Sequence, residues 1–188
     1  MEDQNLYFIA IVLPEELAKQ VVEVQRDIAD RFQSRKALKV MPHITLKAPF
    51  QLLAADHDNL VEWFSNLTIK ISSFDIDLRG FDSFRNPKHP VIYIKPVPNP
   101  DLMDLQKALI RQFYTAFNNS IASGTEASFK PHVTVAYRDL LPEAFNSAWP
   151  EFMTKPFSGS FSVSGFQLLQ HDRKKWNVIT TYDLIKTG

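Results

Sequence analysis

Two short segments of this chain contain the residue types that acid–base chemistry requires. Residues 42–46 read PHITL and residues 131–135 read PHVTV, so each copy has a histidine and a threonine two positions apart. The histidines, His43 and His132, are 89 residues apart, close to half of the 188-residue chain. A histidine gains or loses a proton near neutral pH, and a threonine hydroxyl donates a hydrogen bond to an anionic oxygen. The repeat therefore predicts a site that moves protons around a bound anion.

The spacing within each copy indicates how the two side chains are presented. Successive side chains of a β-strand point to opposite faces, so residues two apart share a face. We therefore expect His43 to point the same way as Thr45, and His132 the same way as Thr134. A single His-x-Thr sequence in a strand is most often structural. Two copies with matching flanks, in two similar half-chains, are typical of a functional site with an acid, a base and two hydroxyl donors.

Composition limits the classes of protein and site. Hydrophobic residues make up 45% of the chain, enough for a sizeable core, and the formal net charge is zero. A neutral chain lacks the overall basic field that drives tight non-specific binding to nucleic acid. A small anion or the end of a polynucleotide remains compatible with local charges. The chain has no cysteine, which excludes disulfides, thiolate metal sites and cysteine nucleophiles.

The N-terminal sequence is acidic and polar, and it gives no sign of a membrane segment. The longest early apolar run, residues 6–13, has eight residues. A run of eight is too short to span a bilayer and lacks the flanks of a signal peptide. We therefore expect a cytoplasmic protein that does not contact a membrane.

The elements around the motifs alternate between strands and helices, with the same order in both halves. Apolar residues recur at helical spacing along residues 17–32, which predicts an amphipathic helix. The first half is expected to contain strands at 6–13, 43–48 and 74–78 and helices at 14–33 and 56–67. The second half is expected to contain strands at 91–97, 132–138, 161–169 and 176–184, helices starting near Asn99 and Pro142, and a polar loop over 118–128.

This internal repeat predicts the fold class. We expect one α+β domain over residues 1–188, built from sequence halves of about 1–88 and 89–188. The halves would form two similar lobes related by a pseudo-two-fold axis, each with a small, mostly antiparallel sheet and outer helices. The motif strands would face each other across a central cleft. No coiled-coil stripe is present, so a monomer is expected.

Two further residues near the first motif are candidates for substrate contact. Lys47 continues the face of His43 and Thr45, so it would add positive charge near a bound phosphate. A solvated lysine at a strand end is an equally good interpretation. Phe50 would stack on a base at the mouth of the cleft, although most of the 15 phenylalanines are expected in the core.

The two motifs, the string PHITLKAPF and the opening YFIAIVLPEEL resemble the two-histidine (2H) phosphoesterase superfamily over essentially the whole chain. The most similar branch is that of the 2′-5′ RNA ligases and RNA 2′,3′-cyclic phosphodiesterases. The resemblance implies that His43 is the proton donor, His132 the proton acceptor, and Thr45 and Thr134 the phosphate-holding residues. It also implies a bilobal fold and no metal or cofactor. The substrate would be an RNA end or nucleotide with a 2′,3′-cyclic phosphate, opened to a 2′-phosphate, or with a 2′-5′ linkage formed reversibly.

One position departs from the pattern of the family. Many members have an arginine five positions after the second histidine, where this chain has Tyr137, followed by Arg138. By strict alternation Arg138, not Tyr137, shares the face of His132 and Thr134. Either residue is a candidate for contact with the ligand.

The residues leave three other functions open. A non-catalytic module of the same fold would bind a nucleotide or RNA end, although binding alone does not need a matched acid and base. A metal enzyme is disfavoured, because two histidines without a clustered third ligand make a poor zinc site. A different phosphoester, such as ADP-ribose cyclic phosphate or a 2′-5′ oligoadenylate, would require the same residues and other cleft walls.

Overall fold

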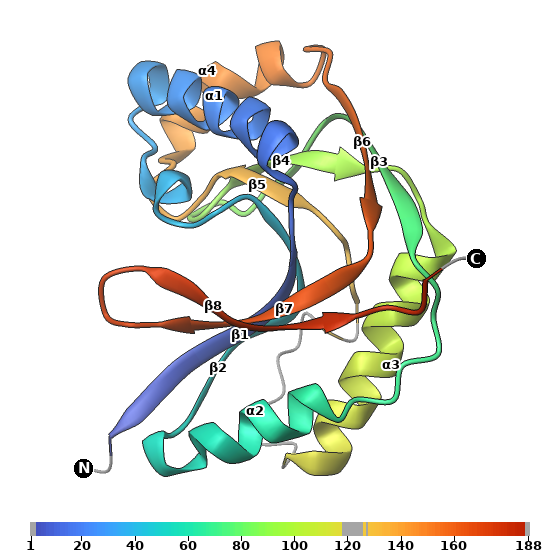
Figure 1. Cartoon of the computed structure of the whole chain (residues 1–188). Coiled ribbons are helices and arrows are strands. Elements are labelled where there is room, and N and C mark those ends of the chain that lie inside the picture. The colour runs from blue at the N-terminus through green and yellow to red at the C-terminus, as the bar shows by residue number, and fades with distance from the viewer. Residues whose placement is uncertain (1–2, 118–125, 127, 187–188) are drawn as a thin grey trace.

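The computed structural model describes residues 3–117, 126 and 128–186, and these contain four α-helices and eight strands (Figure 1). The loop expected over 118–128 therefore lies mostly outside the described residues. The strands are β1 (Gln4–Val12), β2 (His43–Leu53), β3 (Phe74–Phe84), β4 (Val91–Pro96), β5 (Val133–Ala136), β6 (Ser158–Val163), β7 (Gly165–His171) and β8 (Trp176–Asp183). The helices are α1 (Glu15–Phe32), α2 (His57–Ser65), α3 (Pro100–Ala116) and α4 (Pro142–Phe152), with short 3-10 turns η1 (Lys36–Lys39) and η2 (Ala54–Asp56).

The strands form one sheet in the order β6-β3-β4-β5-β2-β1-β7-β8, and every neighbouring pair is antiparallel. The α+β class is confirmed. The two sheets expected from the repeat are the two four-stranded halves of this sheet, joined where Ile44 of β2 pairs with Val133 of β5. The pairing satisfies backbone groups that two separate sheets would leave as open edges. The two motif strands thus occupy the centre.

The halves of the sheet draw strands from both halves of the chain. β3 leaves the first sequence half to pair with β4, and β7 and β8 return to β1. The strand expected over 161–169 is therefore wrong as a single element, because the chain crosses between the two halves at Ser164. Gly165 begins β7 where a Cβ atom would lie 2.5 Å from the carbonyl oxygen of Tyr182, so only glycine fits that approach.

Helices α1 and α3 each pack on the half of the sheet opposite to the strand that precedes them in the chain. α1 follows β1 but packs on β5 and β6, whereas α3 follows β4 and packs on β2. Figure 1 accordingly shows α1 with α4 at one end of the molecule and α2 with α3 at the other. Along α1 the apolar stripe predicted from the sequence is buried at Leu17, Val21 and Ile28. No helix among the described residues has both the length and the apolar character to cross a membrane.

The strand β1 separates two apolar clusters of different size. Tyr7, Ile9 and Ile11 belong to the main core. The alternate residues, Phe8 and Ala10, form a small cluster on the opposite face with Leu169. Phe8 there contacts the ring of His43, at 4.9 Å between ring centroids. The motif side chains therefore lie on the sheet face that carries the smaller cluster.

Candidate active site

The register of the sheet brings the two motifs together. Ile44 and Val133, which pair across β2 and β5, lie between the histidine and the threonine of their respective motifs. Residues flanking a paired position of an antiparallel ladder also lie opposite one another. His43 is therefore opposite Thr134 and His132 is opposite Thr45, with all four side chains on one face. The buried residues between them point into the core, as the alternation predicts.

Both imidazole rings are held by the same local hydrogen bond. Nδ1 of His43 lies 2.7 Å from the carbonyl oxygen of Met41, and Nδ1 of His132 lies 2.7 Å from that of Lys130. A carbonyl oxygen only accepts, so in both rings Nδ1 carries the proton that it donates. Such a bond fixes the orientation and tautomer of a histidine. Nε2 is therefore the ring nitrogen of each histidine available to a ligand.

The surroundings of His43 are apolar. Its ring contacts Phe8, which in turn packs edge-on against Trp176 with ring centroids 4.5 Å apart. Burial lowers the pKa of His43 to about 4, although the hydrogen bond to Met41 opposes this effect and the positive charge of His132 adds to it. Burial disfavours the charged form of an imidazole. His43 is therefore neutral at pH 7 in the free protein.

The surroundings of His132 include charged groups. Its ring lies 5.0 Å from that of Phe84 and 5.4 Å from that of Tyr93, measured between centroids. Burial lowers the pKa of His132, the hydrogen bond to the Lys130 carbonyl opposes this, and the charge of Lys130 adds to the lowering. Both imidazoles thus favour the neutral state, for partly different reasons.

A polar group beside His132 was missed by the sequence reasoning. The Lys130 ammonium lies 3.7 Å from the carboxylate of Asp82 and 5.6 Å from the centre of the Tyr93 ring. Burial raises the pKa of the Tyr93 hydroxyl. The signal was present in the sequence, since Lys130 lies two positions before His132 and alternation places it on the same face. The cluster gives His132 a polar neighbourhood that His43 lacks among the described contacts.

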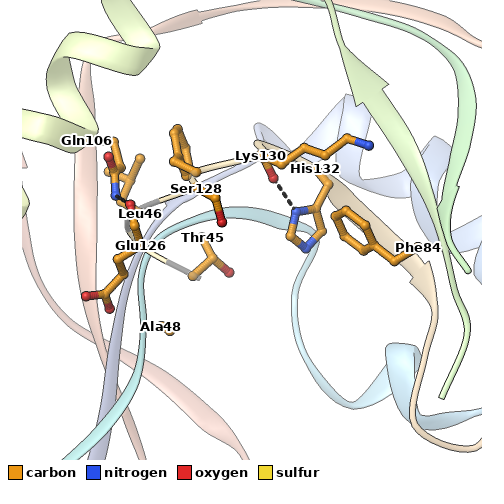
Figure 2. Close-up of a pocket in the computed structure, with 10 residues that line it drawn as sticks. Thr45, Leu46, Ala48, Phe84, Gln106, Glu126, Ser128, Lys130 and His132 are labelled. Carbon is orange, nitrogen blue, oxygen red and sulfur yellow. Dashed lines mark hydrogen bonds between the residues drawn. The ribbon is translucent and has the colours of Figure 1, made fainter. Parts of the chain in front are cut away.

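A cavity of about 460 Å³ lies beside the two motifs (Figure 2). Thr45 and His132 line it, and Phe84, Lys130, Gln106 and Ser128 form part of its wall. Figure 2 shows the ring of Phe84 beside that of His132, with Thr45 across the opening. The volume falls in the range of small-molecule sites. It leaves room for a ligand next to one histidine and the threonine opposite.

The expectations for Lys47 and Phe50 are wrong. Leu46 is the extra residue of a β-bulge, because Thr45 pairs with Ala10 and Lys47 already pairs with Ile9. A bulge interrupts the alternation of side chains, so Lys47 turns to the face covered by α3. There Lys47 is 1% exposed and pairs with Glu126 at 2.7 Å. Phe50 is 3% exposed and packs on Phe113 in the core, 4.9 Å between centroids.

The expected placement of Arg138 is also wrong. β5 ends at Ala136, and Arg138 has a φ of 59°. That left-handed conformation turns the chain, so strict alternation does not extend from His132 to Arg138. Arg138 is exposed, with its guanidinium carbon 5.3 Å from the centre of the Tyr137 ring. Tyr137 and Arg138 are both absent from the lining of the cavity beside His132.

The arrangement has a definite chemical capacity. Each ring presents its Nε2 on the face where the hydroxyl of the opposite motif's threonine also lies. A neutral imidazole accepts a proton and a charged one donates it. Hydroxyl donors stabilise an anion placed between them. Among the described residues, no group of three histidine, aspartate or glutamate side chains is placed to hold a metal ion.

Comparison with known proteins agrees with this geometry. Residues 13–175 match the model of the 2′-5′ RNA ligase superfamily. A putative phosphoesterase of Bacillus pumilus is 26% identical over 172 residues, covering 91% of this chain and 95% of that protein. A putative phosphoesterase of Staphylococcus aureus strain Newman is 27% identical over 176 residues, covering 92% and 96%.

Solved structures share the fold. TT0787 of Thermus thermophilus aligns with a TM-score of 0.69 at 20% identity, covering 97% of this chain and all of that one. E. coli LigT, crystallised with 3′-AMP, aligns with a TM-score of 0.68 at 20% identity, covering 97% and 99%. The family match spans most of the chain and both histidine motifs. The chain belongs to the 2′-5′ RNA ligase superfamily of two-histidine phosphoesterases.

Proposed function

We propose that this protein is a metal-independent 2′,3′-cyclic phosphodiesterase that acts on RNA ends or small nucleotides and yields a 2′-phosphate. The observation that carries the proposal is the register at Ile44 and Val133, which sets each histidine opposite the threonine of the other motif. One phosphate on that face can meet an acid, a base and two hydroxyls at once. Run in reverse, the same groups would form a 2′-5′ linkage.

The proposed reaction adds water to phosphorus and breaks one ester bond. One imidazole Nε2 takes a proton from the water as its oxygen bonds to phosphorus. The other gives a proton to O3′ as the bond between phosphorus and O3′ breaks, which leaves the phosphate on O2′. Each positioned transfer contributes about 10²–10⁴-fold. Thr45 and Thr134 donate hydrogen bonds to the non-bridging oxygens, whose charge grows in the transition state.

The proposal keeps His43 as the proton donor and His132 as the acceptor, as the resemblance implies. A proton donor must carry its proton before the reaction, but burial lowers the pKa of His43 to about 4, so His43 is neutral in the free protein at pH 7. A bound phosphate anion favours the charged form of a nearby imidazole and raises its pKa. The assignment therefore requires that substrate binding recharge His43.

The relatives support a nucleotide substrate. E. coli LigT has been crystallised with 3′-AMP, with phosphate and with ATP. The curated relatives from Bacillus and Staphylococcus are called putative phosphoesterases. These names favour a phosphoester of a nucleotide over other anions. We further infer a cytoplasmic monomer that needs no cofactor.

The test is a turnover assay in chelator. A short RNA ending in a 2′,3′-cyclic phosphate is incubated with wild type, His43→Ala and His132→Ala, and the position of the product phosphate is read. We expect a 2′-phosphate from wild type and a loss of about 10²–10⁴-fold in each variant. Binding of the RNA end without turnover by wild type would replace the proposal with a non-catalytic binding module. Activity that chelator abolishes would contradict the metal-independent mechanism.

A further inference from the structure

A further cavity, of about 570 Å³, lies between the end of β4, the first turn of α3 and the segment that leads into β5. We call it the β4 pocket. Its ionisable lining residues are Asp82, Tyr93, Lys95 and Lys130, and prolines and Met103 supply its apolar walls. The proposed reaction assigns no role to this pocket, although one of its residues, Lys130, also lines the catalytic cavity.

The β4 pocket lies on the same face of the sheet as the histidines. Tyr93 pairs with Thr134 across β4 and β5, and Asp82 pairs with Tyr93 across β3 and β4. Directly paired residues of neighbouring strands share a face, so this row of side chains continues the face that carries His132. The Tyr93 ring also lies 5.4 Å from the His132 ring, measured between centroids. The pocket is therefore a neighbour of the reacting groups.

Lys130 connects the β4 pocket to the catalytic cavity, because it lines both of them. Figure 2 shows its side chain extending past His132 on the side away from Thr45. The side chain is 55% exposed, so its ammonium is open to a ligand. The two cavities thus meet at Lys130, and one ligand can occupy both.

The lining of the β4 pocket has an excess of positive charge. Lys130 lies 3.7 Å from Asp82, a contact that offsets one ammonium group. Lys95 lies two positions after Tyr93 on β4, so alternation places it on the same face. Lys95 is exposed and, within the described part of the chain, has no carboxylate at ion-pair distance. Two lysines against one aspartate favour an anion in the pocket.

The position of the pocket indicates which anion it would take. The ribose of a nucleotide carries phosphate at two places, the 2′,3′ edge and the 5′ oxygen. When a cyclic phosphate lies beside His132, a phosphate on O5′ is the other anionic group of the same nucleotide. A lysine ammonium has three rotatable donors on a flexible stem, so Lys95 and Lys130 suit phosphate oxygens whose positions vary with the 5′ arm of the ribose.

We propose that the β4 pocket is a subsite for a second phosphate, carried on O5′ of the nucleotide whose 2′,3′-cyclic phosphate is opened, and that Lys95 determines the specificity for it. The inference rests on the proposed function, because it assumes that the cyclic phosphate occupies the histidine site. It deepens that function by separating nucleotides that have a 5′-phosphate from those that have a 5′-hydroxyl.

The experiment changes Lys95, because Lys130 also acts on His132 and its removal would alter the basal rate. Wild type, Lys95→Met, Lys95→Arg and Lys88→Met are assayed on adenosine 2′,3′-cyclic phosphate with a 5′-hydroxyl or a 5′-phosphate. Lys88, on the loop that joins β3 to β4, is the matched control, a cation that lines neither cavity.

We expect the 5′-phosphate to raise kcat/KM about 10- to 100-fold in wild type, since a hydrogen bond between charged groups contributes strongly. Lys95→Met should lose most of this gain, whereas Lys95→Arg and Lys88→Met should keep it. The rate on the 5′-hydroxyl nucleotide should be the same in all four proteins.

The outcomes separate the subsite from the proposed function. If wild type opens both nucleotides equally well, the subsite is overturned and the proposed function stands. An equal loss of the gain in Lys88→Met would also overturn the subsite, because the effect would then be one of general charge. A 5′-methyl phosphodiester distinguishes a terminal phosphate from one inside a chain, and a gain with either form supports the subsite.

If neither nucleotide is opened, the proposed function fails and equilibrium binding decides the subsite. The affinities of adenosine 3′-phosphate and adenosine 3′,5′-bisphosphate are then measured for the same four proteins. Tighter binding of the bisphosphate that is lost in Lys95→Met alone would support the subsite. Equal affinity of wild type for the two ligands would overturn it.

Discussion

The two histidine motifs share their local geometry and differ in their surroundings. In each motif Nδ1 of the histidine lies 2.7 Å from the carbonyl oxygen two residues earlier. Each histidine also lies opposite the threonine of the other motif. His43, however, packs on Phe8 in an apolar cluster, whereas His132 lies near the Lys130 ammonium. The same local hydrogen bond and the same strand register thus hold two imidazoles in unlike electrostatic settings.

The strands that carry the motifs differ as well. β2 has eleven residues and contains the bulge that buries Lys47 under α3. β5 has four residues and stops before the left-handed turn at Arg138. The repeat therefore specifies the five residues around each histidine and little beyond them. Proton affinity is set by neighbours outside the repeat, which is why near-symmetry of the motifs does not make the histidines equivalent.

The largest expected effect tests that inequivalence directly. His43→Ala and His132→Ala are each expected to lose about 10²–10⁴-fold on RNA. With a p-nitrophenyl phosphodiester, the leaving group departs without a proton, so the variant that lacks the acid should recover most of its rate. We expect His43→Ala to recover and His132→Ala to remain slow, measured by release of nitrophenolate. Recovery of His132→Ala alone would reverse the assignment, and equal recovery would make the two sites interchangeable.

The next prediction concerns the buried ion pair that the bulge in β2 creates between Lys47 and Glu126. Lys47 and Glu126 are 1% and 6% exposed in their side chains and lie 2.7 Å apart. Lys47→Met leaves a buried carboxylate without its ammonium partner, which costs about 3–5 kcal/mol of unfolding free energy. Urea unfolding measures the loss.

Lys19 provides the matched control for that change. It pairs with Glu15 at 3.0 Å on the exposed face of α1. Exposed pairs contribute about 0–1 kcal/mol, so Lys19→Met should be nearly neutral. Similar small losses in both lysine variants would mean that the bulge does not depend on the buried ion pair.

These contrasts show what the sequence could predict. Alternation placed His43 with Thr45 and His132 with Thr134, because each pair lies before any irregularity of its strand. The same rule failed at Lys47, because one inserted residue reverses the later side chains of a strand, and at Arg138, because β5 has ended at Ala136. Neither the bulge at Leu46 nor the left-handed conformation at Arg138 occurs at a glycine or proline, so the sequence does not indicate either one. The α+β class was predictable from periodicity, and so was the element order except for the single strand expected over 161–169, which is β6 and β7.

The pairing partners of the strands were not predictable in the same way. The helices and strands of the two half-chains suggested two separate sheets. Joining them requires a contact between Ile44 and Val133, which are far apart in sequence, and a crossing of the chain at Ser164. Alternation does place Lys130 on the face of His132, two positions later, but the residue type alone does not mark it as part of a site. Non-local contacts of this kind are the part that local patterns do not encode.

The pH dependence of the unfolding free energy tests the apolar surroundings of His43, with a smaller expected effect than the ion-pair change. The pKa of His43 is about 4 in the folded protein, against about 6.5 in an unfolded chain. Between these values the unfolded state binds a proton that the folded state excludes, so stability is lost as pH falls from about 6.5 towards 4. At pH 4.5 this costs about 2–3 kcal/mol relative to pH 7.

His43→Gln removes that titration and provides the control. Urea unfolding at pH 7, 5.5 and 4.5 should show a smaller acid loss in the variant than in wild type. His132→Gln should reduce the loss in the same direction, since its pKa is also lowered. Parallel curves for His43→Gln and wild type would contradict the apolar setting inferred for His43.

The smallest expected effect isolates the charge that distinguishes the second motif. Lys130 acts on His132 in two opposite ways, because its carbonyl accepts the Nδ1 proton and its ammonium disfavours a second positive charge. Lys130→Met removes only the ammonium, so the pKa of His132 should rise while the ring keeps its orientation. NMR titration of the imidazole protons measures this, and His43 is the internal control because its hydrogen bond is to Met41. A rise confined to His132 would show that the side chain, not the repeated backbone, separates the two histidines. An equal shift of both rings would instead mean that the substitution altered the shared face.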